Sequence, residues 1–182
     1  MAQNSDHWTP LHYSVANGHY EVSKLIVDEI EIKNPKTPSG WTPLHCASKV
    51  KLCQLILEQV IDKNPETNYG ETPLSLAAKS GNVEKFKLFL DLSEDKNPRR
   101  KIGCGFTPFD YAVRHGHLPI CKIIVEVLSK NLSKDELLQT VAKVSRQAGP
   151  GSKEFRPERL TQGESSKEVL AWLDNLEFGL RL

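Results

Sequence analysis

One four-residue pattern recurs four times in this chain of 182 residues, and it constrains the fold more than any other feature. Its copies are Thr9-Pro10-Leu11-His12, Thr42-Pro43-Leu44-His45, Thr72-Pro73-Leu74-Ser75 and Thr107-Pro108-Phe109-Asp110. Successive threonines are 33, 30 and 35 residues apart. A unit of this length does not bury its apolar face alone, so a sequence with this period predicts small units stacked on one another.

Each unit predicts a helix, a turn and a second helix. Threonine followed by proline is typical of a helix N-terminus, because the hydroxyl caps free amides and proline lacks the amide that would stay unpaired. A glycine-containing triplet such as Ser80-Gly81-Asn82 then ends the first helix in a left-handed turn. In the second helix apolar residues follow helical spacing, as in Val83, Phe86 and Leu90. Lys-Asn-Pro, at 33–35, 63–65 and 96–98, and a glycine (Gly40, Gly70, Gly105) bracket the turn into the next unit.

The two unequal intervals have local explanations. In the second repeat, Ala47-Ser48-Lys49 runs directly into Val50, so the triplet between the two helices is missing. In the interval of 35 residues, two residues are added to the turn that enters the fourth repeat, beside Arg99-Arg100-Lys101. The sequence therefore predicts a shortened second repeat and a lengthened turn before the fourth.

The unit resembles the ankyrin repeat, in which T-P-L-H opens the first helix. The resemblance covers roughly residues 5–128, with repeats at about 5–35, 36–65, 66–98 and 99–128, and it implies an all-α repeat solenoid with short β-hairpin-like turns. Two departures stand out. Asp or Ile followed by Lys-Asn-Pro replaces the usual Gly-Ala-Asp-x-Asn ending, and His7 stands where the turn glycine is expected. The N-terminal cap is expected to be weak or absent.

Residues 129–182 do not repeat and resemble no family. Ser133-Lys134-Asp135-Glu136 is a capping-box pattern that opens a helix within 129–148, which we expect to cap the solenoid. Gly149-Pro150-Gly151 indicates a linker over 149–164. A short amphipathic helix is predicted within 165–182. One alternative has this last helix folding into the concave groove as a regulatory element.

The resemblance implies a scaffold or adaptor that binds another protein through its concave face and hairpin tips. Trp8, Trp41 and Phe106 directly precede their threonines, while repeat three has Glu71 there, with Tyr69 two positions earlier. In the family this position faces the concave side, and tryptophan and tyrosine are frequent at interaction hot spots. The alternative is that these rings pack against the next hairpin.

Basic residues indicate a second set of contacts. Lys49, Lys79 and Arg114 share one register at the end of the first helix and are expected to form a row beside the aromatic strip. The two rows together suit a peptide with apolar anchors and acidic neighbours. The Arg99-Arg100-Lys101 finger is a further candidate contact, and its alternative is a solvated charge run.

Catalytic and metal-binding patterns are not indicated. No nucleophile elbow, phosphate loop or HExxH motif occurs. His45-Cys46 with Cys53, and His115-x-His117 with Cys121, lack the paired spacing of a four-ligand zinc site. Asp110 replaces the usual histidine at a helix start, where capping explains a carboxylate. We expect no enzyme activity, cofactor, metal or small-molecule substrate.

Composition limits the kinds of partner and the cellular compartment that we expect for this chain. The chain has 24 Lys and Arg against 23 Asp and Glu, which argues against binding nucleic acid through its phosphates. It lacks a run of 18 apolar residues and a signal-like N-terminus, so we expect no membrane span. Four cysteines without a CxxC pair favour reduced thiols in the cytoplasm, with the nucleus also open. We expect a monomer. The alternative function is a fragment or regulatory subunit of a larger protein whose activity lies elsewhere.

Overall fold

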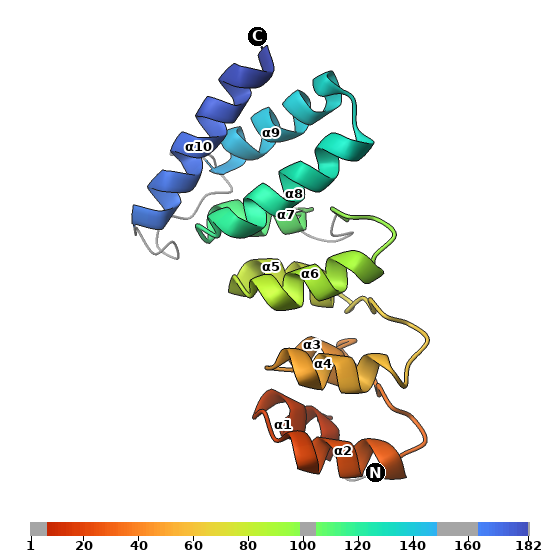
Figure 1. Ribbon diagram of the computed structural model, residues 1–182. Helices are drawn as coiled ribbons and strands as arrows, with labels where there is room; N and C mark the ends of the chain where they lie inside the picture. The colour runs from red at the N-terminus through yellow and green to blue at the C-terminus, as the bar shows by residue number, and fades with distance from the viewer. Residues whose placement is uncertain (1–6, 99–104, 149–163, 182) are drawn as a thin grey trace.

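The computed structural model describes residues 7–98, 105–148 and 164–181, and the regular structure in these ranges is entirely helical. Four pairs of helices stack one above another, and a further pair lies at the C-terminal end (Figure 1). We call α1, α3, α5 and α7 the first helices, and α2, α4, α6 and α8 the second helices. In chain order the helices are α1 (Pro10–Ala16), α2 (Tyr20–Glu29), α3 (Pro43–Cys46), α4 (Val50–Leu57), α5 (Pro73–Ser80), α6 (Val83–Leu92), α7 (Pro108–Arg114), α8 (Leu118–Asn131), α9 (Lys134–Ala148) and α10 (Glu164–Arg181).

Each first helix begins at its Thr-Pro pair, as the motif predicts, because threonine and the residue three positions later cap each other. In repeat three the Ser75 amide donates to Thr72 Oγ1 at 3.1 Å, and the Thr72 amide donates to Ser75 Oγ at 2.9 Å. In repeat four Asp110 Oδ2 accepts from both the amide and the hydroxyl of Thr107, each at 2.7 Å. The buried carboxylate of Asp110 therefore serves as a helix cap, and the interpretation made from the sequence is confirmed.

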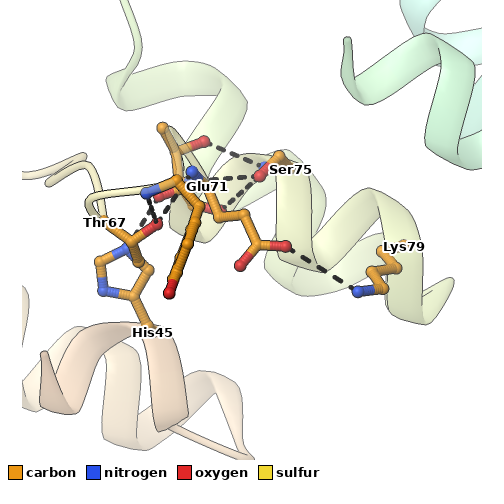
Figure 2. A network of polar contacts seen from close by, with 7 residues as sticks. His45, Thr67, Glu71, Ser75 and Lys79 are labelled. Carbon is orange, nitrogen blue, oxygen red and sulfur yellow. Dashed lines mark hydrogen bonds and ion pairs between the residues drawn. The ribbon is translucent and has the colours of Figure 1, made fainter. Parts of the chain in front are cut away.

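Two buried histidines connect consecutive repeats. Nδ1 of His45 accepts the Thr42 amide at 3.2 Å, so the neutral ring carries its proton on Nε2. Nε2 lies 3.2 Å from the Glu71 carbonyl oxygen in the next repeat (Figure 2). His12 reaches the carbonyl oxygen of Trp41 in the same way, at 3.4 Å. Burial lowers the pKa of His45 to about 4, which keeps the ring neutral at physiological pH.

The Lys-Asn-Pro segment joins each second helix to the next first helix. Lys96 Nζ donates to the carbonyl of Leu90 at 2.7 Å, so a cation lies at the negative end of the α6 dipole. Asn97 Oδ1 accepts the amide of Phe109, at the start of α7, at 3.1 Å. This segment replaces the usual ending of the unit and still satisfies backbone groups of both helices.

The turn before each Thr-Pro requires a left-handed backbone at the glycine position. Gly40 has a φ of 84°, and a Cβ atom there would lie 2.7 Å from the Asn68 amide nitrogen of the following turn. His7 occupies the same place in repeat one and takes the same conformation, with a φ of 60°. A non-glycine residue is strained in this region, so His7 keeps the turn geometry at an energetic cost.

Repeat two is shortened where the sequence predicts it. Its first helix, α3, has four residues, against eight in α5. Neighbouring repeats supply contacts across the missing turn. The amide and hydroxyl of Ser48 both donate to the Val15 carbonyl, at 3.1 and 3.0 Å, and Lys85 Nζ donates to the Ala47 carbonyl at 2.6 Å. A groove of about 800 Å³ remains between the start of α2 and α4.

The tail forms a helical pair at the C-terminal end of the array. From the end of α8, α9 runs back across the stack, and α10 returns beside it (Figure 1). Helix α9 packs against α7 and α8, and α10 packs against α9 and also contacts α7 and α8. The buried apolar side chains of the pair are Leu137, Val141, Val144, Val169 and Leu173.

Two expectations about the tail change with this arrangement. The last helix is not short, because α10 runs through 18 residues and begins at Glu164. It also covers the end of the array, against α7, α8 and α9, which replaces the alternative that it folds into the concave groove. The capping box at the start of α9 forms as expected, with the Ser133 amide donating to Glu136 Oε2 at 2.9 Å.

Candidate protein-binding surface

The candidate surface lies on the first helices and on the turns that lead into them, and we call it the first-helix face. Trp8, Trp41, Glu71 and Phe106 each precede the Thr-Pro pair of their repeat, and all four are half-buried. Because the repeats stack in order, this shared position places one of these side chains at every level of the array. Each side chain keeps part of its surface accessible.

The two tryptophans pack against rings of their own repeats. The Trp8 centroid lies 5.1 Å from that of Tyr13 and 5.6 Å from that of His12. The Trp41 and His45 centroids are 5.6 Å apart. These separations are typical of favourable tilted aromatic pairs. The indoles are therefore held in place while partly exposed, which lowers the entropy lost on binding.

In repeats three and four the same face combines rings with cations. The guanidinium carbon of Arg114 lies 4.4 Å from the Phe106 ring centroid, and the Phe106 and Tyr111 rings meet edge to face at 5.8 Å. Lys79 Nζ, from the preceding repeat, lies 5.8 Å from the Tyr111 centroid. A cation over a ring is stabilised by about 0.5–1 kcal/mol at an exposed site. These contacts hold Lys79 and Arg114 beside an aromatic surface.

Glu71 interrupts the row of rings in repeat three. Its amide donates to Thr67 Oγ1 at 3.1 Å, which fixes the turn, and its carboxylate Oε1 lies 3.9 Å from Lys79 Nζ (Figure 2). The Lys79 side chain is 46% exposed, and pairs with an exposed partner contribute about 0–1 kcal/mol. An acidic group on a partner can therefore compete with Glu71 for the lysine.

Lys49 does not join Lys79 and Arg114 in the expected basic row. Lys79 and Arg114 lie in the last turns of α5 and α7, whereas the shortened α3 ends at Cys46 and Lys49 is the N-cap residue of α4. Its Nζ donates to the Gly18 carbonyl in repeat one at 3.3 Å. The equal spacing from threonine does not give Lys49 an equivalent place, because repeat two lacks the triplet and α3 therefore ends before Lys49.

Of the predicted contacts at the hairpin tips, the structure describes one. Tyr69 is 53% exposed at the tip before repeat three, where a partner can reach its ring. Arg99, Arg100 and Lys101 lie outside the described residues, so the basic finger stays an expectation.

A second row on the first-helix face was not singled out from the sequence. It lies four positions after each threonine and consists of Tyr13, Cys46, Leu76 and Tyr111. Tyr13 is 43% exposed, and Cys46 and Leu76 are half-buried, so this row widens the apolar surface beside Trp8 and Trp41. The signal was available, because the four residues share a register as regular as that of the tryptophans.

The histidines and cysteines have structural surroundings. Among the described residues, no three His, Cys, Asp or Glu side chains are grouped to hold a metal ion. His115 stacks on His117 at 6.0 Å, and His117 Nε2 lies 3.2 Å from the Lys79 carbonyl oxygen. Cys53 and Cys121 are fully buried free thiols, and burial raises the pKa of Cys121 to about 12. Such thiols are poor nucleophiles and metal ligands at neutral pH.

Comparison with known families identifies the class of protein. A family model described as ankyrin repeats (3 copies) matches residues 1–67 and 48–135. These matches cover most of the chain, so the protein belongs to the ankyrin-repeat family, and the resemblance drawn from the Thr-Pro motifs is confirmed. Domains of this family are generally protein-interaction modules, and the comparison identifies no enzyme domain.

A local similarity extends to one much longer protein. Over 48 residues the chain is 46% identical to a Caenorhabditis elegans protein named transient receptor potential cation channel subfamily A member 1 homolog. The aligned stretch is 26% of this chain and 4% of that relative, so the chain spans only a small fraction of the relative's length. In the described part of this chain, every helix is too short or too polar to cross a membrane.

Proposed function

We propose that this chain is a non-catalytic scaffold or adaptor that binds an extended segment of another protein along its first-helix face. The supporting observation is the row of half-buried rings, Trp8, Trp41 and Phe106, one each in repeats one, two and four. Aromatic side chains that are rigid and partly exposed are the commonest energetic anchors of protein interfaces. The neighbouring rings reduce the freedom that Trp8 and Trp41 would lose on binding.

The two halves of the face suit different parts of the bound segment. Trp8, Tyr13 and Trp41 offer an apolar surface for aliphatic or aromatic anchors. Lys79 and Arg114 offer positive charge beside Phe106 and Tyr111, which suits an acidic residue next to an apolar one. The segment would then lie with its acidic end over repeats three and four. Tyr69 and the tri-basic turn at 99–101 would add contacts at the hairpin tips.

The same proposal involves no cofactor, metal, small-molecule substrate or nucleic acid. Basic and acidic residues are nearly balanced, 24 against 23, so the chain as a whole does not attract a polyanion. The free thiols of Cys46, Cys53 and Cys121 support a reducing compartment, the cytoplasm or the nucleus.

The test compares two variants of the first-helix face with one on the opposite side of the repeat. A partner is first isolated on the immobilised chain and identified by mass spectrometry. Its affinity is then measured by calorimetry for Trp41→Ala, Lys79→Glu and Lys87→Ala, with folding checked by circular dichroism. Lys87 is an exposed residue of the second helix α6.

Trp41→Ala should weaken binding by about 2 kcal/mol or more, roughly thirtyfold, if the indole is an anchor. Lys79→Glu should mainly slow association, with an effect that shrinks as salt is added. Lys87→Ala should bind as the wild type does. Equal affinities for all three variants would show that the partner uses another surface, and Arg99, Arg100 and Lys101 would be replaced next.

A further inference from the structure

Four basic side chains gather where the first helices of repeats three and four end, and we call them the basic cluster. Lys79 lies in the last turn of α5, and Arg114 lies in the last turn of α7. His115 is the C-cap residue of α7, and His117 is the N-cap residue of α8. Lys79 is exposed and the other three are half-buried, so each keeps surface that a ligand can reach.

Contacts between the two repeats bring these four groups together. His117 Nε2 lies 3.2 Å from the Lys79 carbonyl oxygen, and the rings of His115 and His117 stack with their centroids 6.0 Å apart. Burial lowers the pKa of His115, and the positive charges of His117, Lys79 and Arg114 lower it further. Such an effect requires the four groups to lie close to one another.

The cluster is held in place before any ligand binds. A Cβ atom at Gly81 would lie 2.5 Å from His117 Cε1, so this ring rests directly against the backbone at the end of α5. On the other side, Lys79 and Arg114 lie against the Tyr111 and Phe106 rings through the cation–π contacts described above. Side chains fixed in this way lose less conformational entropy on binding.

The positive charge of the cluster is only partly balanced. Glu71 Oε1 lies 3.9 Å from Lys79 Nζ, which is beyond hydrogen-bond distance (Figure 2). The neighbouring charges that act on the His115 ring are all positive. The helix dipoles largely offset one another here, because α6 and α8 begin one short turn after α5 and α7 end. The surroundings therefore favour an anion.

The donors of the cluster suit a phosphate monoester better than a carboxylate. The Arg114 guanidinium can donate two parallel hydrogen bonds, the Lys79 ammonium donates from the preceding repeat, and a neutral His115 ring adds one N–H. A carboxylate has two oxygens and one charge, whereas a phosphorylated side chain has three acceptor oxygens and a charge of about −1.5 to −2 at pH 7. Phe106 and Tyr111 can contact apolar neighbours of the phosphorylated residue.

We propose that the basic cluster binds the phosphate of a phosphorylated residue in the protein segment that occupies the first-helix face. The phosphate takes the place of Glu71 at Lys79 Nζ, and Arg114 and His115 are its further donors. This inference rests on the proposed function, because it specifies the residue that lies over repeats three and four. It makes partner binding depend on phosphorylation of that residue.

The probes are short immobilised peptides of degenerate sequence with phosphoserine, phosphotyrosine, serine or glutamate fixed at the centre. At least one phosphorylated set should bind the whole chain about tenfold or more tightly than the serine and glutamate sets. Equal binding to the phosphorylated and glutamate sets would overturn the proposal, because a carboxylate would then serve as well. Inorganic phosphate alone should bind at least about tenfold more weakly than the phosphorylated peptides. Equal affinity would indicate a site for free phosphate and would overturn the assignment to a protein segment.

Four variants locate the site. Lys79→Gln and Arg114→Gln should each remove most of the preference for phosphorylated peptides. Lys87→Gln is the control, because it changes the charge equally at an exposed position of α6. Glu71→Gln should strengthen binding, since it removes the carboxylate that competes for Lys79, and a residue with only a structural role would not produce this gain. Circular dichroism checks that each variant is folded.

A preference that survives in both Lys79→Gln and Arg114→Gln would overturn the proposal, and so would an equal loss in Lys87→Gln. These results are separate from the test of the proposed function with Trp41→Ala. If Trp41→Ala weakens binding of the isolated partner while all peptide sets bind alike, the phosphate site is wrong and the first-helix face stands. A phosphate preference with no effect of Trp41→Ala would instead contradict the proposed role of the aromatic row.

Discussion

Repeats one and two are held to their neighbours by different contacts from repeats three and four. His12 and His45 each place a buried imidazole against a backbone carbonyl of the next repeat. Repeats three and four have the shorter side chains of Ser75 and Asp110 at that position, and these cap their own helices, as the two histidines also do. The large buried rings also lie in repeats three and four, where Phe86, Phe89 and Phe109 are fully buried.

The two halves also differ in how the stack ends. The α9–α10 pair covers repeat four, while repeat one leaves Val22 and Leu25 exposed. In a stacked array each repeat is stabilised chiefly by its neighbours, so an uncovered repeat has roughly one interface where an internal repeat has two. The comparison teaches that one repeat pattern accommodates both polar bridges and apolar packing between neighbouring units.

Removing the C-terminal cover is expected to have the largest effect on stability. Deletion of residues 133–182 removes both α9 and α10, whereas deletion of 149–182 removes α10 alone. Each fully buried side chain of α9 contributes about 1.5–3 kcal/mol, so the longer deletion should unfold at a distinctly lower urea concentration. Equal midpoints for the two truncated chains would show that α9 does not cap the array.

A pair of single substitutions compares the two ends directly. Leu173→Ala, at a fully buried position of α10, should lower the free energy of unfolding by about 2–5 kcal/mol. Leu25→Ala, at a position 68% exposed in α2, should change it by less than about 0.5 kcal/mol. Urea unfolding of both variants measures the two changes in the free energy of unfolding. A loss at Leu25 as large as that at Leu173 would mean that the open end is covered after all.

Replacing His45 by serine, the residue that repeat three has at this position, tests whether the buried imidazole makes the stability depend on pH. Burial lowers the folded-state pKa of His45 to about 4, below the unfolded value near 6.5. The unfolded chain therefore binds more protons between these values, and the free energy of unfolding should fall as pH drops from about 6.5 to about 4.

His45→Ser should lower stability by about 1–3 kcal/mol at pH 7, because the bridge to Glu71 is lost. It should also flatten the pH dependence between about 6.5 and 4. Thermal or urea unfolding at a series of pH values measures both effects. The matched comparison is Ser75→Ala in repeat three, which should lower stability without altering the pH slope. An unchanged slope in His45→Ser would show that this imidazole does not govern the acid response.

The smallest expected effect is a difference in local opening between repeats two and three. Helix α3 has one turn and relies on contacts from Ser48 and Lys85, whereas α5 has eight residues and ends at Gly81 in a left-handed turn. Amides of α3 and α4 should therefore exchange with solvent faster than those of α5 and α6 in native-state hydrogen exchange. Uniform protection across the two repeats would contradict this expectation.

Much of the fold was readable from the sequence because local rules and the repeat period agree. Thr72-Pro73 and its counterparts mark helix starts, Gly81 marks a helix end, and the triplet missing after Lys49 correctly predicted a shortened repeat. The Ser133–Glu136 capping box also marked the start of α9. These features depend on neighbours within four residues, where hydroxyl, proline and glycine chemistry determines the backbone.

The candidate surface was only partly readable. The shared register of Trp8, Trp41 and Phe106 predicted side chains at equivalent places, and the structure puts them there half-buried. The register did not predict that Lys49 would lie apart from Lys79 and Arg114. Whether Lys49 belongs to the first helix depends on the length of the turn that follows, and α3 ends at Cys46. Tyr13 was overlooked although its register was equally regular, since a single exposed tyrosine has no local signature.

The sequence by itself determined the repeated unit and the boundaries of most helices, because capping and turn formation are local and recur with the period. Only the tertiary structure decided which equivalent residues are buried and which are left open. Val22 and Leu52 have nearly the same chemistry and the same register, yet one is half exposed and the other is sealed. Leu52 lies beside residues of repeat one, such as Tyr20, and burial depends on what packs against a side chain as much as on its own polarity.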